Sequence, residues 1–413
     1  MLLNRLWIGL FLIAMLTASV KLIGYGDTLV FQSIVDAMFT SAKSAFEIAL
    51  YLTGALCLWM GIMQIGEQGG ALGYLTKAVS PLFVKLFPDV PKNHPAVGAM
   101  MMNFSANMLG LDNAATPLGL KAMNQLQEIN PEKDKASNAQ IMFLVLNTSG
   151  LTIIPVSILA FRMSAESNNP TEVFLPILIT TFISSLAGLI FVSLKQRINL
   201  FQPVILAYIG TATLFIILLL AYLISNPHHV STISSVAGNV ILFGIIIVFI
   251  LLAIRSKINV YESFVEGAKG GFDVAIKIIP FLVAILVAVA VFRASGAMEM
   301  LFNGIKELAI IMGVKCLEFI DALPTAFMKP FSGTAARGMM LDVFATEGLG
   351  PDSFAGRLAS TFQGSTETTF YVLSVYFGSV GIKKTRYAAG AGLFADFIGI
   401  IAAILIAFIF FSC

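Results

Sequence analysis

The chain has 413 residues, of which 58% are hydrophobic and only 12% are charged, and its mean hydropathy is +0.90. Soluble domains are roughly 45–50% apolar and about 25% charged, so this composition excludes a water-soluble globular fold and predicts an integral membrane protein. The net charge is only +2, and the basic residues are scattered over short loops. This excludes the concentrated basic surface that nucleic-acid binding requires.

Several apolar runs are long enough to cross a membrane, since a helix of about 20 residues spans about 30 Å of hydrocarbon. The clearest predicted spans are residues 3–23, 45–66, 172–194, 203–224, 236–254, 272–292 and 387–411. The first run could be mistaken for a signal peptide, but its length favours a retained span. Other apolar stretches are interrupted by polar residues, and the functional site is expected there: 72–87, 96–120, 140–161, 297–320, 325–345 and 355–378.

Basic loops predict the orientation, because cytoplasmic loops carry an excess of Lys and Arg. Three loops carry such residues: one follows the span that ends at residue 194, one follows the span that ends at residue 254, and one precedes the span that begins at residue 387. We therefore expect a multi-pass protein of the bacterial inner (cytoplasmic) membrane, with the N-terminus in the cytoplasm and the C-terminus outside. In this arrangement the span 172–194 runs inward and the span 387–411 runs outward.

The sequence contains an internal repeat. Residues 42–49 align with 268–275, residues 103–105 align with 330–332, and residues 147–152 align with 363–368. Because the order of features agrees while the final helices run in opposite directions, the pattern predicts an all-α integral membrane fold of two inverted-topology repeats. The predicted units are 1–200 (first repeat with an extra N-terminal helix), 201–257 (two linking helices) and 258–413 (second repeat).

The first polar motif of each repeat predicts a re-entrant hairpin. Unpaired polar groups in hydrocarbon cost several kcal/mol each, so such segments are tolerated only inside protein or beside a wet cavity. The tip of the first hairpin is expected near Gly110 and Asp112, and that of the second within 332–338. The candidate solute or ion ligands from these motifs are Asn103, Ser105, Asn107, Asp112, Asn113 and Thr116, and Ser332, Thr334 and Arg337.

The second polar motif of each repeat predicts a broken helix, opened beside Gly150 and Pro155 or beside Gly364. Half-helix ends then point their dipoles at a ligand, N-termini toward anions and C-terminal carbonyls toward cations. A carboxylate near a helix centre costs about 2.5–3.5 kcal/mol, so Glu367 is expected to face a cavity and bind a proton or cation. The candidate ligands here are Asn147, Thr148, Ser149 and Thr152, and Gln363, Ser365, Thr366, Glu367 and Thr368.

Each candidate also has a structural interpretation. Membrane hydroxyls commonly bond to their own backbone or to a neighbouring helix. Asn107 and Asp112 could cap half-helices, and Arg337 and Glu367 could form an ion pair between the repeats. Three cysteines (Cys57, Cys316 and Cys413) without CxxC spacing, and three histidines (His94, His228 and His229) in loops, indicate neither a metal site nor a disulfide framework.

Two strings in these motifs resemble a known family. Residues 103–117 (NFSANMLGLDNAATP) are similar to spore maturation protein A, and residues 362–371 (FQGSTETTFY) with 376–381 (YFGSVG) are similar to spore maturation protein B. Both halves resemble the nucleoside-recognition "gate" domain shared with concentrative nucleoside transporters and with the membrane part of ferrous iron transporters. The resemblance implies a transporter-like fold of hairpins and broken helices, and by analogy a homo-oligomer.

Two functions remain open from the sequence. One is a secondary permease for a small polar solute, nucleoside-like or a small carboxylate, coupled to Na⁺ or H⁺ and needing no other cofactor. The alternative is a non-transporting membrane scaffold or regulator of the cell envelope or of spore maturation. No phosphate loop, His-Glu-x-x-His motif or catalytic triad is present, so we do not expect an enzyme. The expected partners are the solute and membrane lipid, and no nucleic acid.

Overall fold

A computed structural model describes residues 2–91, 93–110, 112–226, 230–311, 313 and 316–411. Of the residues singled out in the sequence, the side chains of Asp112 and Asn113, and all of His228, His229 and Cys413, lie outside this description. The described secondary structure is helical apart from one isolated bridge between Lys135 and Lys384. The predicted all-α class is therefore confirmed.

Seven helical stretches in the described part of the chain are long and apolar enough to cross a membrane, and each overlaps one of the predicted spans. Two of them, α2 and α12, are 39 and 35 residues long and begin well before the predicted apolar runs. The helices that form these stretches are α1 (Leu2–Tyr25), α2 (Val30–Gln68), α8 (Phe174–Gln196), α9 (Pro203–Ile205) continuing through η2 (Leu206–Gly210) into α10 (Thr211–Ser225), α11 (Val230–Arg255), α12 (Val260–Ala294) and α18 (Ala388–Phe410). A short 3-10 helix, η1 (Pro170–Val173), precedes α8.

The interrupted apolar stretches form shorter helices between the long ones. In each half a single helix is followed by a hairpin of two helices and then by a helix broken in its middle. In the first half these are α3 (Ala71–Leu86), α4 (Pro95–Met108) with α5 (Asp112–Glu128), and α6 (Asn138–Thr148) with α7 (Val156–Ser164). In the second half they are α13 (Ala297–Ile311), α14 (Phe319–Met328) with α15 (Gly333–Ala345), and α16 (Phe354–Ser365) with α17 (Thr369–Ser379).

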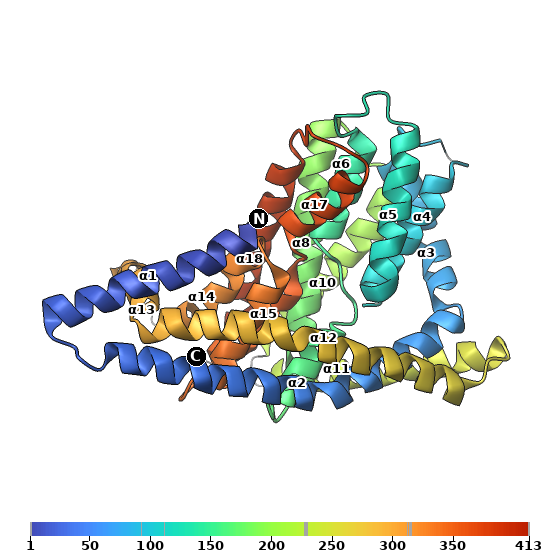
Figure 1. The fold of residues 1–413 in the computed structure, drawn as a ribbon. Helices are drawn as coiled ribbons and strands as arrows, with labels where there is room; N and C mark the ends of the chain where they lie inside the picture. Colours follow the sequence, from blue (N-terminus) through green and yellow to red (C-terminus); the bar gives the residue numbers. More distant parts are fainter. Residues whose placement is uncertain are drawn as a thin grey trace.

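The long helices α2 and α12 lie side by side in antiparallel directions (Figure 1). A Cβ atom at Gly267 would lie 2.5 Å from the Cβ of Gln64, and one at Gly271 would lie 2.7 Å from the Cα of Cys57. The contacting residue numbers thus decrease along α2 as they increase along α12, which shows that the two helices are antiparallel. Small residues four apart allow this close approach of two backbones.

The final helices of the two halves, α8 and α18, also pack antiparallel. Ser184 Oγ donates to the carbonyl oxygen of Ala395 (2.9 Å), and further along Gln196 Nε2 donates to the hydroxyl of Tyr387 (2.9 Å). Antiparallel packing of equivalent helices is the direction that inverted repeats require. The inverted symmetry itself, and the predicted domain boundaries, stay predictions.

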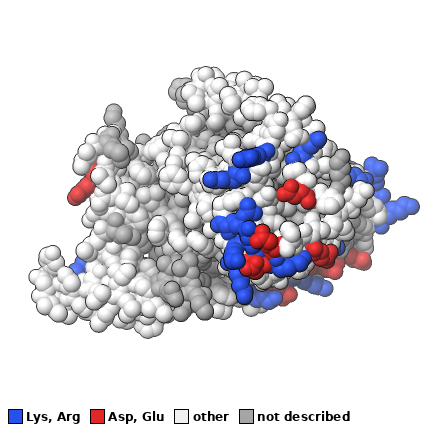
Figure 2. Space-filling model, turned by 90° about the horizontal axis from the view of Figure 1, so that it is seen from above, with Lys and Arg blue, Asp and Glu red and all other residues white. Residues whose placement is uncertain are grey.

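Most of the charged side chains seen in Figure 2 gather over one part of the surface, and few lie elsewhere on that face. The polar loop after α5 is bound to the loop before α18, because the backbone N–H groups of Lys383 and Lys384 both donate to Asp134 O at 2.9 Å. Since Tyr387 also contacts Gln196 at the end of α8, two of the three loops predicted to face the cytoplasm lie at the same end of the bundle.

The cysteines differ from the sequence expectation in one respect. Cys57 on α2 is a free thiol, but Cys316 is disulfide-bonded. The expectation of no disulfide is therefore wrong at Cys316. Spacing along the chain reveals pairs within one motif, whereas a disulfide can also join segments that only folding brings together.

Candidate functional site

A cavity of about 670 Å³ lies where the hairpins, the broken helices and the α2–α12 pair meet. Sites for small molecules typically have volumes of roughly 300–1,000 Å³. Seven of the residues predicted from the polar motifs line this cavity, four from the first half and three from the second: Asn107, Thr116, Asn147, Thr152, Arg337, Gln363 and Glu367. Side chains from both halves therefore share one site.

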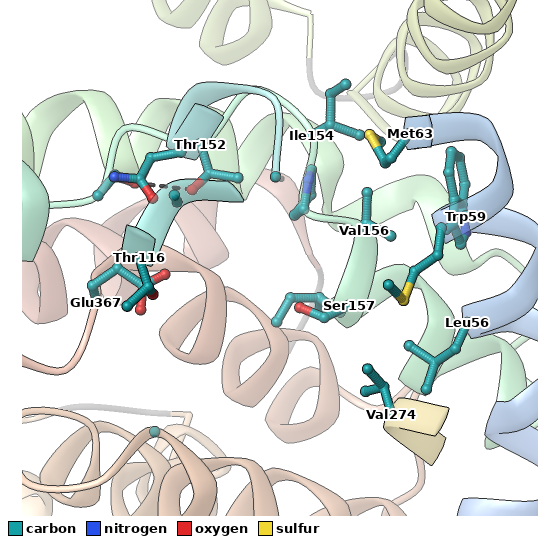
Figure 3. Close-up of a pocket in the computed structure, with 18 of the residues that line it drawn as sticks. Leu56, Trp59, Met63, Thr116, Thr152, Ile154, Val156, Ser157, Val274 and Glu367 are labelled. Carbon is teal, nitrogen blue, oxygen red and sulfur yellow. Dashed lines mark hydrogen bonds between the residues drawn. The ribbon is translucent and has the colours of Figure 1, made fainter. Parts of the chain in front are cut away.

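The two sides of the cavity differ in chemistry (Figure 3). Glu367 and Thr116 lie close together on one side, while Leu56, Trp59 and Met63 of α2 form an apolar wall on the other. A small number of polar groups facing an apolar surface is the usual composition of a small-molecule site, because the polar groups orient the ligand and the apolar wall removes water.

The breaks in the two broken helices contact each other directly. The backbone N–H of Glu367 donates to the carbonyl oxygen of Thr148 at 2.8 Å. Gly150 has a φ of +52°, and a Cβ atom there would lie 3.1 Å from Cγ of Glu367. Glycine is required here for both its left-handed conformation and its lack of a side chain. The first break thus positions Glu367 of the second.

Each break is also bonded to the hairpin of its own half. The N–H of Ile153 donates to Met108 O (2.8 Å) in the first half, and the N–H of Phe370 donates to Pro330 O (3.0 Å) in the second. Lys329, at the tip of the second hairpin, adds a bond from Nζ to the carbonyl oxygen of Gln363 (2.7 Å). These bonds satisfy backbone groups that the interrupted helices leave open at membrane depth.

An amide network connects the first hairpin to the broken helices. Asn107 Nδ2 donates to Asn147 Oδ1 (2.8 Å), and the hydroxyl of Tyr376 on α17 donates to the same oxygen (3.4 Å). Asn103 donates to the Tyr376 hydroxyl (3.3 Å) and to Ala115 O (2.7 Å), which ties α4 to α5. Asn103 is buried and does not line the cavity, so its position is that of a structural residue.

The side chain of Glu367 is solvent-accessible, and it lines the cavity. It makes no hydrogen bond or ion pair with another described side chain. The alternative ion pair with Arg337 is not formed; the guanidinium of Arg337 lies 5.1 Å from the centre of the Phe161 ring. The carboxylate of Glu367 is therefore presented to whatever occupies the cavity.

Five of the ten predicted hydroxyl ligands bond to backbone and a sixth, Ser105, bonds to a hydroxyl of another helix, as the structural interpretation anticipated. Ser332 caps α15 by accepting from Ala335 N (3.1 Å). Ser105 accepts from the Thr76 hydroxyl (3.3 Å). Four others donate to carbonyl oxygens two or three residues earlier in the chain: Thr148, Ser149, Thr152 and Ser365. Of all six, only Thr152 lines the cavity, and Thr334, Thr366 and Thr368 do not line it either.

Two details of the second half differ from the sequence prediction. The hairpin turns at 329–332, not within 332–338, so that Thr334 and Arg337 belong to the first turns of α15. Gly364 lies inside α16, where a Cβ atom would lie 2.8 Å from the side chain of Ile177. Its role is close packing against α8, and the break lies at 366–368.

Several residues at or near the site were missed by the sequence reasoning. Lys329, Trp59 and Tyr376 line the cavity. Lys329 is a cation between apolar stretches, and Tyr376 begins the segment 376–381 that resembles spore maturation protein B. Trp59 lies within a predicted span and carries no local signal, because only the packing of α2 brings it to the cavity.

A buried ionic cluster joins the halves away from the cavity. Arg162 is fully buried and donates through Nη2 to Glu172 Oε1 (2.7 Å) and Asp352 Oδ1 (2.9 Å). Arg357 donates through Nε to the same oxygen of Glu172 (2.7 Å). Because Arg162 and Glu172 precede α8 while Asp352 and Arg357 belong to the second half, the cluster fixes one half against the other.

Comparisons with known proteins identify relatives of this chain. The family model described as "Gate: Nucleoside recognition" matches residues 49–165, which reach from α2 to the end of the first broken helix. Spore maturation protein A of Bacillus subtilis (strain 168) is 40% identical over 187 residues, which are 45% of this chain and 92% of that protein. Spore maturation protein B of the same organism is 50% identical over 156 residues, 38% of this chain and 84% of that protein.

Proposed function

The chain belongs to the spore maturation protein A and B families, and from this premise we propose that it is a secondary permease for a small polar solute. The observation that carries the proposal is the cavity at which both broken helices and both hairpins meet, with the Glu367 carboxylate presented to it. Discontinuous helices that meet at a shared site are the usual construction of secondary transporters, because their ends offer backbone groups to a substrate.

The lining of the cavity supports a solute with several hydrogen-bonding groups. Asn147 and Gln363 offer amides, Thr116 offers a hydroxyl and Glu367 offers an acceptor. A nucleoside-like solute fits this set, and the matched family model is described by nucleoside recognition. A small carboxylate is the second class, supported by Lys329 and Arg337 in the lining. Glu367 is the proposed site of the coupling ion, Na⁺ or H⁺.

The proposed location is the bacterial inner membrane, with the N-terminus in the cytoplasm and the C-terminus outside. The disulfide at Cys316 supports an external position for the segment just before α14, since disulfides persist in oxidising compartments. Only 11% of the spanning window of α1 and 6% of that of the α9–α10 stretch are buried within the chain. Such apolar surfaces support contact with lipid or with a second copy in a homo-oligomer.

The second candidate is a non-transporting scaffold or regulator of the envelope. Neither candidate is an enzyme. It is supported by the names of the two relatives, which refer to spore maturation and not to transport. A scaffold needs no solute site, so the two candidates differ in whether the cavity binds a small molecule.

Thermal unfolding of the purified protein with a panel of nucleosides and small carboxylates separates the two candidates. A ligand that binds only the folded state raises the melting temperature in a saturable way. The permease proposal predicts such a shift with at least one compound, lost in Asn147→Ala and retained in Glu47→Gln, an exposed carboxylate on α2. Absence of any saturable shift across the panel favours the scaffold.

A further inference from the structure

The final helix, α18, carries a carboxylate inside its apolar span. The side chain of Asp396 is only 2% exposed. The hydroxyl of Thr369, the first residue of α17, donates to its Oδ2 at 2.7 Å, while Oδ1 has no hydrogen-bond partner among the described residues. An ionisable side chain within a membrane span is costly to keep charged and normally marks an ion or proton site.

Glycines on either side of Asp396 bring the breaks of both broken helices against this carboxylate. Gly392, Asp396 and Gly399 share one face of α18, since residues four and three apart lie above one another on a helix. A Cβ atom at Gly392 would lie 2.7 Å from Cγ2 of Thr369 and 3.4 Å from Oγ1 of Thr148, and one at Gly399 would lie 3.1 Å from Cγ2 of Thr366. Asp396 therefore lies directly behind the wall that presents Glu367 to the cavity.

The surroundings of Asp396 are polar but contain no ion-pair partner for it among the described residues. The charged groups that act on it are Lys329, at the end of α14, and Glu367, in the break. The helices α6 and α8 also pack here, and the hydroxyls of Thr148 and Ser184, which do not titrate, lie near the glycines on either side of Asp396. A carboxylate excluded from water without a paired cation takes up a proton in preference to remaining charged.

We propose that Asp396 is a proton-binding site that the break at 366–368 couples to the cavity. The proton adds to Oδ1, while Oδ2 continues to accept from Thr369. Loss of the proton leaves a second negative charge behind the break that carries Glu367, and like charges oppose each other at short range. Protonation of Asp396 and occupation of the cavity beside Glu367 are therefore linked.

Infrared difference spectroscopy of the full-length protein tests the proton site without any solute. The carbonyl stretch of a neutral carboxylic acid is expected at a pH at which exposed carboxylates are ionised. The band is lost in Asp396→Asn and kept in Asp36→Asn, which changes an exposed aspartate on α2. Labelling the unmutated protein with [4-¹³C]aspartate shifts the band, which keeps the test valid even if D396N does not fold. A band that survives in folded D396N, or that does not shift on labelling, overturns the proposal.

The coupling step rests on the proposed permease function and has its own test in proteoliposomes. Tritiated uridine and ¹⁴C-succinate serve as probes, with and without an imposed pH gradient. In the wild type the gradient drives accumulation above equilibrium; in D396N uptake reaches equilibrium only, with or without the gradient. Gradient-driven accumulation by D396N overturns the coupling, whereas failure of the wild type to move either probe counts against the permease function and leaves the spectroscopic result to decide the proton site.

Discussion

The backbone N–H of Glu367 donates to the carbonyl oxygen of Thr148 at 2.8 Å, so that the break of one half is hydrogen-bonded to the break of the other. These residues lie more than two hundred positions apart in the sequence. The bond places Glu367, whose carboxylate lines the cavity, at the junction of the two halves. A movement of either half that opens this junction also moves Glu367.

Gly150→Ala tests whether this junction needs its glycine. The φ of +52° and the 3.1 Å approach to Glu367 Cγ both oppose a side chain. We expect a loss of about 1–2 kcal/mol in unfolding free energy, the cost of a left-handed conformation for an L-residue. Thermal unfolding in detergent measures it. Gly73→Ala on α3, where a Cβ meets nothing within 4 Å, is the control and should be neutral or slightly stabilising.

The α2–α12 crossing predicts a second effect. In Gly271→Leu the new Cβ would lie 2.7 Å from the backbone N and Cα of Cys57. Backbone atoms cannot rotate away, so the two helices must separate, and overpacking of this kind costs about 1–3 kcal/mol. The melting temperature should fall well below that of Gly304→Leu, a change on α13 with open space around it. Equal melting temperatures for the two variants would contradict the tight crossing.

The buried cluster around Arg162 predicts the largest loss of stability. Arg162→Met leaves Glu172 and Asp352 without their shared cation, and breaking a buried ion pair on one side costs about 3–5 kcal/mol. Arg255→Met, at the exposed end of α11, is the matched control and should change stability by less than about 0.5 kcal/mol. A similar melting temperature for both variants would show that the cluster does not hold the halves together.

Asp352 predicts a dependence on pH. Burial alone would raise the pKa of Asp352, but the hydrogen bonds from Ser167 and Asn168 and the charge of Arg162 together hold that pKa below its ordinary value. A carboxyl group with a lowered pKa in the folded state contributes stability above the unfolded value of about 3.9, and this is lost as the pH falls through the lower folded value. Melting temperatures from pH 7 to pH 3 should therefore fall less steeply for Asp352→Asn than for the wild type. Parallel curves would contradict this role.

The sequence predicted the parts of the fold that depend on local composition. The seven spans follow from apolar length, and the hairpins and breaks follow from polar residues inside apolar stretches, because both signals lie within a few turns of helix. Glu367 was predicted to face a cavity because a charged side chain in an apolar run is energetically costly. The same rule, applied to the run 387–411, would have singled out Asp396, its only charged residue.

What the sequence could not supply depends on long-range packing. Gly364 was assigned to the break because glycine can open a backbone, but glycine also permits close packing, and Ile177 of α8 decides between the two. The hydroxyl of Ser332 is used by a helix cap instead of a ligand, which depends on where the hairpin turns. Trp59 and Tyr376 reach the cavity through contacts between elements distant in the chain.

Uptake of tritiated uridine and ¹⁴C-succinate into proteoliposomes, compared between the wild type, Glu367→Gln and Glu47→Gln, tests the permease function most directly. The wild type and E47Q should show saturable uptake of at least one probe. E367Q should lose it at least tenfold while keeping its melting temperature, because the substitution removes the carboxylate and keeps the shape of the side chain. Saturable uptake that is unchanged in folded E367Q, or a wild type that transports neither probe, would contradict the account.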